Sequence, residues 1–386
     1  MRAIQKLVNE GIISENNIPG NILELLYEKD GIHLRLREKD FNMLVEFGIL
    51  KDGLTYKDGF IYDGDIKYDA DIHDKKNLDE IKKLLGGKLK KGQIILGGFY
   101  LGPESFYKAL NDMSEEERSQ FGMSGVEKVN QLYGDAELRA LQRKGGRFVN
   151  SGMMVTLNGS IVSDQLEDGR IVSGIGGQFN FVTMAHAIPD GKLIMAIRAT
   201  RGSGKHTKSN IVFRYGHCSV PKYWRDIIVT EYGIGHIRGL SEEQVTQELI
   251  KIADSRFQQI LIKQAKNHGK LEQDWELPEE YRNNYPEKVE KFIMQYQSQG
   301  YFKQFPFGTD ITQEEAVLGG SLKGLLAYKS SKPVSMIFKL ISEFFRSVPE
   351  KAAPYLKRMD LENPAGLGEK FQQKTVLTAL RNARSI

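Results

Sequence analysis

The sequence has very little cysteine, no long apolar run and almost no net charge. Its 386 residues include one cysteine, so no disulfide can form within the chain. No stretch approaches the roughly 20 consecutive apolar residues that a membrane-spanning helix needs. The 54 lysines and arginines are nearly balanced by 50 aspartates and glutamates, which gives no reason to expect nucleic acid as a partner. Residues 1–17 also lack the apolar core of a secretory signal, so we expect a cytoplasmic protein with no membrane partner.

Metal chemistry is not indicated either. No cluster of cysteine and histidine has the spacing of a zinc site, so we expect no metal. Cys218, the single cysteine, is expected to be a small buried apolar residue. Apolar residues make up 40% of the chain, which is enough for a sizeable hydrophobic core in one large domain or two ordinary ones.

Apolar runs and helical patterns alternate along the chain. Residues 192–200 and 225–233 are short, nearly continuous apolar runs, typical of strands that are covered on both faces. Asn158 and Gly159 predict the turn of a hairpin, and Ser241 predicts the start of a helix with acidic residues in its first turn. We therefore predict an α/β protein with a mixed sheet.

A glycine-rich segment at residues 171–181 is the most informative local feature. Gly174, Gly176 and Gly177 follow a β-branched run and precede an aromatic-flanked stretch. A backbone without Cβ atoms can approach a ligand closely and point N–H groups at a phosphate or an oxyanion. The alternative is a tight turn after a strand, and glycine spacing alone does not decide between the two.

Basic residues gather in two places. In residues 75–92 lysines recur on a predicted helix, which favours a solvated face. In residues 198–210 Arg198, Arg201, Lys205 and Lys208 lie in a loop rich in glycine and serine, which could hold phosphate through N–H groups and cations together. An ordinary surface loop is the alternative.

The glycine segment, the strand that leads to the basic loop, and the run from Val229 to Gly239 occur in an order and spacing that resemble the C-terminal half of the acetyl-CoA hydrolase/CoA-transferase family. The likeness extends through residues 97–107, 147–159 and 252–265. It implies a CoA-transferase-like mixed sheet covered by helices, with a helical C-terminal extension.

The resemblance and the composition together suggest four parts. Residues 1–90 form an N-terminal segment with a degenerate nucleophile motif, and residues 91–270 the α/β core. Residues 271–312, rich in tyrosine, asparagine and proline, are expected to form an extended arm, and residues 313–386 a helical region. Within that region residues 335–345 are strongly amphipathic, which favours core packing and leaves a dimer contact as the alternative.

Family chemistry requires a glutamate that attacks an acyl-CoA thioester, together with N–H groups that stabilise the oxyanion. Coenzyme A is then a substrate, with no covalently bound cofactor. The resemblance places the oxyanion and CoA site at Gly174, Gly176, Gly177, Gln178 and Asn180, with the CoA phosphates near Lys205 and Lys208. Asn180 stands where many relatives have aspartate.

The nucleophile position departs from the family pattern. Residues 31–53 resemble the nucleophile motif, yet Arg35 occupies the position of the glutamate. A guanidinium cannot form an anhydride because it has no acid function. Glu38, three residues further on, and Glu231 are the candidate catalytic carboxylates, and a supporting role is favoured for Glu231.

Three functions remain open at this stage. The chain could be an acyl-CoA:carboxylate CoA-transferase or acetyl-CoA hydrolase, possibly one part of a split enzyme whose first α/β half is a separate chain. It could be a CoA-binding pseudoenzyme or regulatory subunit, which Arg35 favours. It could also be a structural protein that keeps only the fold, against which the intact glycine segment argues. A small carboxylate is the expected acceptor, and a homodimer is possible.

Overall fold

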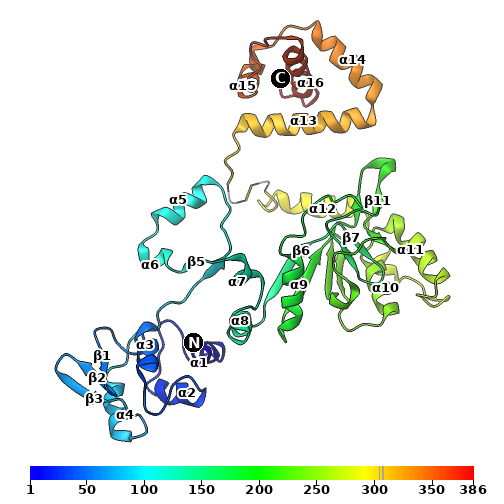
Figure 1. Ribbon diagram of the computed structural model, residues 1–386. Helices are drawn as coiled ribbons and strands as arrows, with labels where there is room; N and C mark the ends of the chain where they lie inside the picture. Colours follow the sequence, from blue (N-terminus) through cyan, green and yellow to red (C-terminus); the bar gives the residue numbers. More distant parts are fainter. Residues whose placement is uncertain (304, 307) are drawn as a thin grey trace. The chain divides into compact units, whose positions relative to one another are not determined.

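The computed structural model describes residues 1–303, 305–306 and 308–386. Helices and several small sheets alternate along the chain (Figure 1), which confirms the predicted α/β class and the helical C-terminal extension. The chain divides into two compact units, one of residues 1–100 with 113–302 and the other of residues 101–112 with 303–386. No helix of the described residues has the length and apolar character needed to cross a bilayer.

The first 90 residues have a hydrophobic core of their own. Leu7, Leu26 and Leu44, one from each of the first three helices, are fully buried in a cluster that also contains Ile61 of the adjoining sheet. The helices are α1 (Arg2–Asn9), α2 (Ile22–Glu28), α3 (Glu38–Glu46) and α4 (Lys75–Lys82). The sheet is an antiparallel meander of β1 (Thr55–Lys57), β2 (Phe60–Asp63) and β3 (Ile66–Asp69).

A four-stranded sheet forms the centre of the first unit. Its strand order is β14 (Gly233–His236), β13 (Ile227–Thr230), β9 (Lys192–Ala196) and β6 (Arg147–Ser151). Strands β6, β9 and β13 are parallel, whereas β14 returns antiparallel from β13. Helix α9 (Gln178–Ala187) packs on β6 and β9, and Phe148 of β6 lies against Phe181 of α9. The apolar runs that predict covered strands are therefore confirmed.

Smaller elements surround this sheet. The hairpin of β7 (Met154–Thr156) and β8 (Ile161–Val162) turns at Asn158 and Gly159, as predicted, and Gly159 has a φ of 87°. Strand β12 (Ile211–Val212) pairs with β7, and β10 (Thr200–Arg201) pairs with β11 (Lys208–Ser209). The remaining elements of the first unit before β6 are β4 (Ile95–Gly97), β5 (Phe121–Met123), α6 (Glu115–Arg118), α7 (Val126–Asn130) and α8 (Ala136–Gln142), while α5 (Glu104–Asp112) belongs to the second unit.

Two helices follow the sheet. Helix α10 (Glu242–Lys251) begins after Ser241, whose hydroxyl accepts the N–H of Gln244, so the predicted N-cap is confirmed. Helix α11 (Ser255–Asn267) packs on α10. Residues 271–312, expected to be extended, contain the helix α12 (Pro286–Gln297), which the sequence prediction missed. Pro286 at its first position favours a helix start because the missing N–H is unpaired there in any case.

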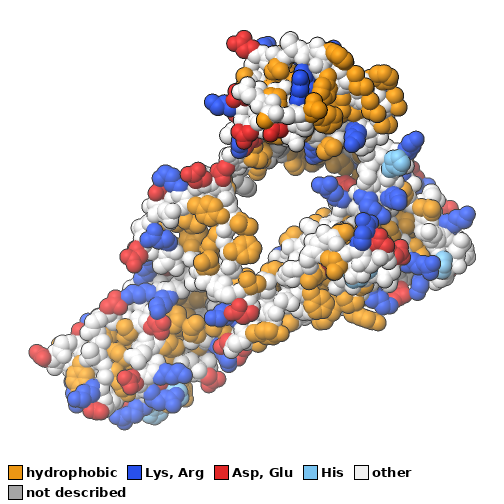
Figure 2. All heavy atoms as spheres, turned by 45° about the horizontal axis from the view of Figure 1, so that its top comes forward, with side chains coloured by type: hydrophobic (Ala, Val, Ile, Leu, Met, Phe, Trp, Pro, Cys, Tyr) orange, Lys and Arg blue, Asp and Glu red, His pale blue; other side chains and the backbone are white. Residues whose placement is uncertain are grey.

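Besides α5, the second unit contains four further α-helices among its described residues. They are α13 (Gln313–Ser331), α14 (Pro333–Phe344), α15 (Ala353–Arg358) and α16 (Leu367–Asn382). On α14 the buried side chains include Glu343, which binds Arg381 of α16 at 3.1 Å. Its apolar side chains at positions 334, 337, 338 and 341 are more than half exposed instead. Core packing, which the pattern favoured, therefore holds for Met336, which packs with Leu325 and Ala379, but not for these four side chains, and apolar side chains gather on the surface of the unit (Figure 2).

Candidate functional site

Three parallel strands end at one edge of the central sheet. β6 ends at Ser151, β9 at Ala196 and β13 at Thr230, and the first two of these residues are paired with Cα atoms in register. Ligands of open α/β sheets bind outside the carboxyl ends of parallel strands, where the chain leaves the sheet in loops. Among the residues predicted for the site, Glu231 directly follows β13 and the basic loop follows β9, whereas the glycine segment follows β8 and leads into α9.

The glycine segment leads into a helix. Gly174 and Gly176 are exposed, and Gly176 adopts a φ of 56°, which a residue with a side chain rarely does. Gly177 is the N-cap of α9 and supplies no capping side chain. The first N–H groups of a helix have no partner within the helix and carry a partial positive charge. The segment is thus the start of a helix that presents N–H groups, and not the turn of a strand.

Gln178 fixes this helix start to the sheet. Its side chain is only 8% exposed, and its Nε2 donates to the carbonyl oxygen of Ser151 at 2.7 Å. Its Oε1 is buried and has no hydrogen-bond partner among the described residues. The bond ties the first turn of α9 to the end of β6, so Gln178 has at least a positioning role. Asn180, one turn into the helix, is partly buried and its carbonyl oxygen accepts the hydroxyl of Thr183 at 3.0 Å.

Asn130 is a site residue that the sequence did not reveal. It ends α7, is 9% exposed, and its side chain lies against the backbone of Gly177. A Cβ atom added to Gly177 would lie 2.3 Å from Asn130 Nδ2, so any other residue here would force the Asn130 amide to shift. An amide N–H donor therefore lies beside the N–H groups at the start of α9. Such a cluster of donors is the arrangement that stabilises a developing oxyanion.

Glu231 supports the neighbouring loop. It follows β13 directly, and its Oε2 accepts the backbone N–H of Ala199 at 2.8 Å. Ala199 lies three residues beyond the end of β9, so the carboxylate joins the ends of two adjacent strands. The next residue, Tyr232, donates its hydroxyl to the buried Asp254 at 2.8 Å. Burial and this hydrogen bond both raise the pKa of Tyr232 well above its ordinary value.

The basic loop forms a hairpin. Lys205 and Lys208 are exposed, Lys205 in a short 3-10 turn and Lys208 at the start of β11. Arg201 is engaged differently, because its Nη1 donates to the carbonyl oxygen of Ser209 and to Asn210 Oδ1, both at 2.7 Å. The two lysines are therefore free to reach outward, while the arginine braces the hairpin.

Arg35 and Glu38 belong to the N-terminal core rather than to this sheet. The side chain of Arg35 is 61% exposed, and its Nη2 lies 3.8 Å from Asp69 Oδ1. Glu38 is exposed at the first position of α3. The three residues from Arg35 to Glu38 thus lead from a loop into a helix, and they do not follow a strand or a tight turn. Asp40 is the buried carboxylate of this segment, and its Oδ2 accepts the backbone N–H of Arg37 at 3.0 Å at the start of α3.

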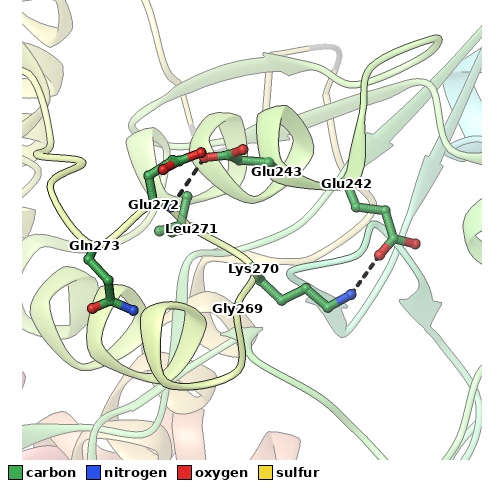
Figure 3. Close-up of a pocket in the computed structure, with 7 residues that line it drawn as sticks. All are labelled: Glu242, Glu243, Gly269, Lys270, Leu271, Glu272 and Gln273. Carbon is green, nitrogen blue, oxygen red and sulfur yellow. Dashed lines mark hydrogen bonds and ion pairs between the residues drawn. The ribbon is translucent and has the colours of Figure 1, made fainter.

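A separate acidic pocket of about 380 Å³ lies beside the start of α10 (Figure 3). Glu242 binds Lys222 and Lys270, and these ion pairs lower the pKa of Glu242 to about 2. Glu243 accepts the backbone N–H of Glu272 at 3.3 Å. The carboxylates of Glu242 and Glu243 are thus held by lysines and backbone rather than left open for a ligand. Among the described residues no group of acidic, histidine or cysteine side chains could hold a metal ion.

The exposure of Cys218 contradicts the prediction that it is buried. The residue is exposed rather than buried, because it lies on the loop that follows β12 and not within an element.

The comparisons with known proteins match the part of the chain that contains most of these residues. A family model described as the acetyl-CoA hydrolase/transferase C-terminal domain matches residues 102–265, which include the glycine segment, Asn130, both loop lysines and Glu231, but neither Arg35 nor Glu38. The 4-hydroxybutyrate coenzyme A transferase of Clostridium kluyveri is 33% identical over 119 residues, 31% of this chain and 28% of the relative. The butyryl-CoA:acetate CoA-transferase of Anaerostipes caccae is 33% identical over 121 residues, 30% of this chain and 27% of the relative.

A solved structure is also similar. The crystal structure of RipA from Yersinia pestis matches 50% of this chain and 42% of its own, at 25% identity and a TM-score of 0.39. The matched region spans less than a third of each of the two curated relatives.

Proposed function

We propose that the chain binds a CoA thioester at the carboxyl edge of its central sheet. The premise is that the chain belongs, through residues 102–265, to the acetyl-CoA hydrolase/CoA-transferase family. The reaction proposed there is transfer of CoA from an acyl-CoA to a small carboxylate, or hydrolysis of acetyl-CoA. The observation that carries the proposal is the packing of the Asn130 amide on Gly177 at the start of α9. We place the protein in the cytoplasm.

Asn130 and the helix start would stabilise the oxyanion. When a nucleophile adds to the thioester carbonyl, its oxygen gains negative charge, and Asn130 Nδ2 with the first N–H groups of α9 can donate hydrogen bonds to it. Gly174 and Gly176 keep the approach open, since a Cβ at either position would meet no atom within 4 Å. Gln178 holds this geometry through its bond to Ser151. Asn180 lines the same turn, and Lys205 and Lys208 would contact the CoA phosphates.

The proposed covalent route needs a glutamate. Its carboxylate adds to the thioester carbonyl and expels CoA thiolate, which leaves a mixed acyl anhydride. The thiolate then attacks the glutamyl carbonyl, releases the acyl group as a carboxylate and forms a glutamyl-CoA thioester. An acceptor carboxylate takes CoA through a second anhydride, or water hydrolyses the thioester. Glu38 is our candidate for this role, because the carboxylate of Glu231 is already bound to the N–H of Ala199.

A second candidate function is a CoA-binding pseudoenzyme or regulatory subunit. It is favoured by Arg35, which stands at the position of the family nucleophile and cannot form an anhydride. Under either function a separate chain could supply a further α/β half, and a homodimer is possible. Light scattering of the purified protein, alone and with candidate partner chains, tests both associations.

The deciding experiment is intact-protein mass spectrometry after brief exposure to acetyl-CoA, with peptide mapping of any adduct. We expect a CoA adduct that is lost in Glu38→Gln and kept in Glu231→Gln. The control Glu28→Gln, at the end of α2, should keep it as well. An adduct that disappears only in Glu231→Gln would exchange the two roles. CoA binding measured by calorimetry without any adduct would support the second function, and absence of CoA binding would overturn both.

A further inference from the structure

A groove of about 410 Å³ lies between the β10–β11 hairpin and α11. Arg201 and Lys208 come from the hairpin, Phe213 and Arg214 from the segment after β12, and Phe257 and His268 from α11 and its end. The volume falls in the range of sites for small organic ligands. Of the residues that line this groove, the proposed function uses only Lys208, as a contact for the CoA phosphates.

The groove is strongly basic. Arg201, Lys208 and Arg214 line it, and none of its described lining residues is an aspartate or glutamate. The pocket at the start of α10 has the opposite character, because three glutamates line it beside one lysine. Cations without carboxylates beside them are suited to phosphate groups, which accept several charge-assisted hydrogen bonds.

Its wall is aromatic as well as basic. The rings of Phe213 and His268 lie 4.5 Å apart at their centroids, and Phe257 lines the same groove. Ile260, which also lines it, is 55% exposed. A planar base could stack on such a surface, and stacking on an aromatic side chain stabilises a bound base. Rings and cations together therefore indicate a ligand that carries both a heteroaromatic base and phosphates.

The groove adjoins the edge of the sheet where the glycine segment lies. Arg201 is two residues from Ala199, whose N–H is bound by Glu231, so the two Cα atoms are at most about 7 Å apart. Asn210 joins them further, since its Nδ2 donates to the carbonyl oxygen of Arg198 at 2.8 Å and its Oδ1 accepts from Arg201. One elongated ligand could therefore extend from the strand ends into the groove.

We infer that this groove binds the nucleotide end of the CoA thioester, with the adenine against Phe213 and His268 and the phosphates at Lys208 and Arg214. The inference rests on the proposed function, because it takes a CoA thioester as the ligand. It assigns the recognition of CoA over a shorter pantetheine thioester to residues of the hairpin and α11.

The test separates the two ends of CoA. Isothermal titration calorimetry measures binding of adenosine 3′,5′-bisphosphate and of CoA to the full chain and to the variant K208E/R214E. We expect both affinities to fall at least about tenfold, since two charge-assisted contacts are reversed. Lys263→Glu, an exposed charge reversal on α11 outside the groove, should change neither affinity by more than about twofold. Thermal melting confirms that each variant folds.

Phe213→Leu tests the stacking without changing charge. It should weaken the bisphosphate several-fold and leave inorganic pyrophosphate unaffected. If the chain binds CoA and K208E/R214E weakens binding no more than Lys263→Glu does, the groove assignment and the phosphate contact of Lys208 are wrong, while the proposed binding of a CoA thioester stands. If the native chain binds neither CoA nor acetyl-pantetheine, the proposed function itself fails. Binding of the bisphosphate in that case would show a nucleotide site unrelated to CoA and would also overturn the inference.

Discussion

The side-chain amide of Asn130 occupies the space that any side chain at position 177 would need, with 2.3 Å between its Nδ2 and an added Cβ. The two residues come from different elements, α7 and the start of α9, so their contact fixes one element against the other. Asn130 is nearly buried and cannot move aside into solvent without leaving a gap. The fit between them governs the first two predictions.

Gly177→Val should displace Asn130 and weaken CoA binding by at least about tenfold, because overpacking shifts neighbouring groups. Calorimetry with CoA measures the change. Gly87→Val is the matched control, since a Cβ at Gly87 meets nothing within 4 Å and this exposed residue lies outside the proposed site. If the two variants bound CoA with equal affinity, position 177 would not be part of the CoA site.

Asn130→Ala should lower kcat by about a hundredfold and change KM little, as expected when one oxyanion donor is lost. Asn130→Asp keeps the size of the side chain but replaces the N–H donor with an acceptor, and should be at least as slow. The measurement is steady-state release of free CoA from acetyl-CoA, followed with a thiol reagent. A variant that lowers kcat only in proportion to its loss of folded protein would point to packing alone.

Arg35→Glu should raise turnover at least about tenfold if position 35 is the nucleophile position, because it restores the acid that the anhydride requires. The side chain is 61% exposed, so the change should be tolerated by the fold. Arg37→Glu, with a 62% exposed side chain two residues further on, is the control for charge alone. An unchanged rate in Arg35→Glu would show that position 35 is not the nucleophile position.

Elements with strong local signals could be predicted from the sequence. The covered strands β9 and β13, the turn at Asn158 and Gly159 and the cap at Ser241 follow from residue order alone, because each depends on neighbours in the chain. The glycine segment was found for the same reason. Its role as a helix start was missed, since three glycines give no helical periodicity before Gln178.

Features that depend on tertiary contact could not be predicted. Asn130 is far upstream of Gly177 and sits in a polar stretch with no motif of its own, so only the packing of α7 on α9 reveals it. The groove beside α11 likewise joins separate segments of the chain. Periodicity shows that α14 has an apolar stripe but cannot tell whether another element covers it.

Glu242→Gln should reduce the dependence of stability on acid pH. The two lysine partners hold the pKa of Glu242 at about 2 in the folded chain, against 4.5 for an ordinary glutamate. A depressed folded-state pKa stabilises the protein above the ordinary value, and the contribution is lost as the pH falls from about 4.5 towards 2.

Because the Glu242 side chain is 38% exposed, screening should limit this contribution to about 1 kcal/mol at pH 7. Urea unfolding between pH 7 and pH 2 measures it, with Glu280→Gln as an exposed control. The free energies of unfolding of Glu242→Gln and the native chain should converge at the acid end. Curves that stay parallel would show that the ion pairs do not stabilise the fold.

The last prediction concerns the exposed apolar side chains of α14. Phe338 is 69% exposed and Leu377 is fully buried, although both are large apolar residues on amphipathic helices. Phe338→Ser should change the free energy of unfolding by no more than about 0.5 kcal/mol, whereas Leu377→Ala should lower it by about 2–5 kcal/mol through loss of packing. Urea unfolding followed by circular dichroism at several protein concentrations measures both. A large, concentration-dependent cost of Phe338→Ser would contradict the prediction, because it would show that another copy of the chain covers this face in solution.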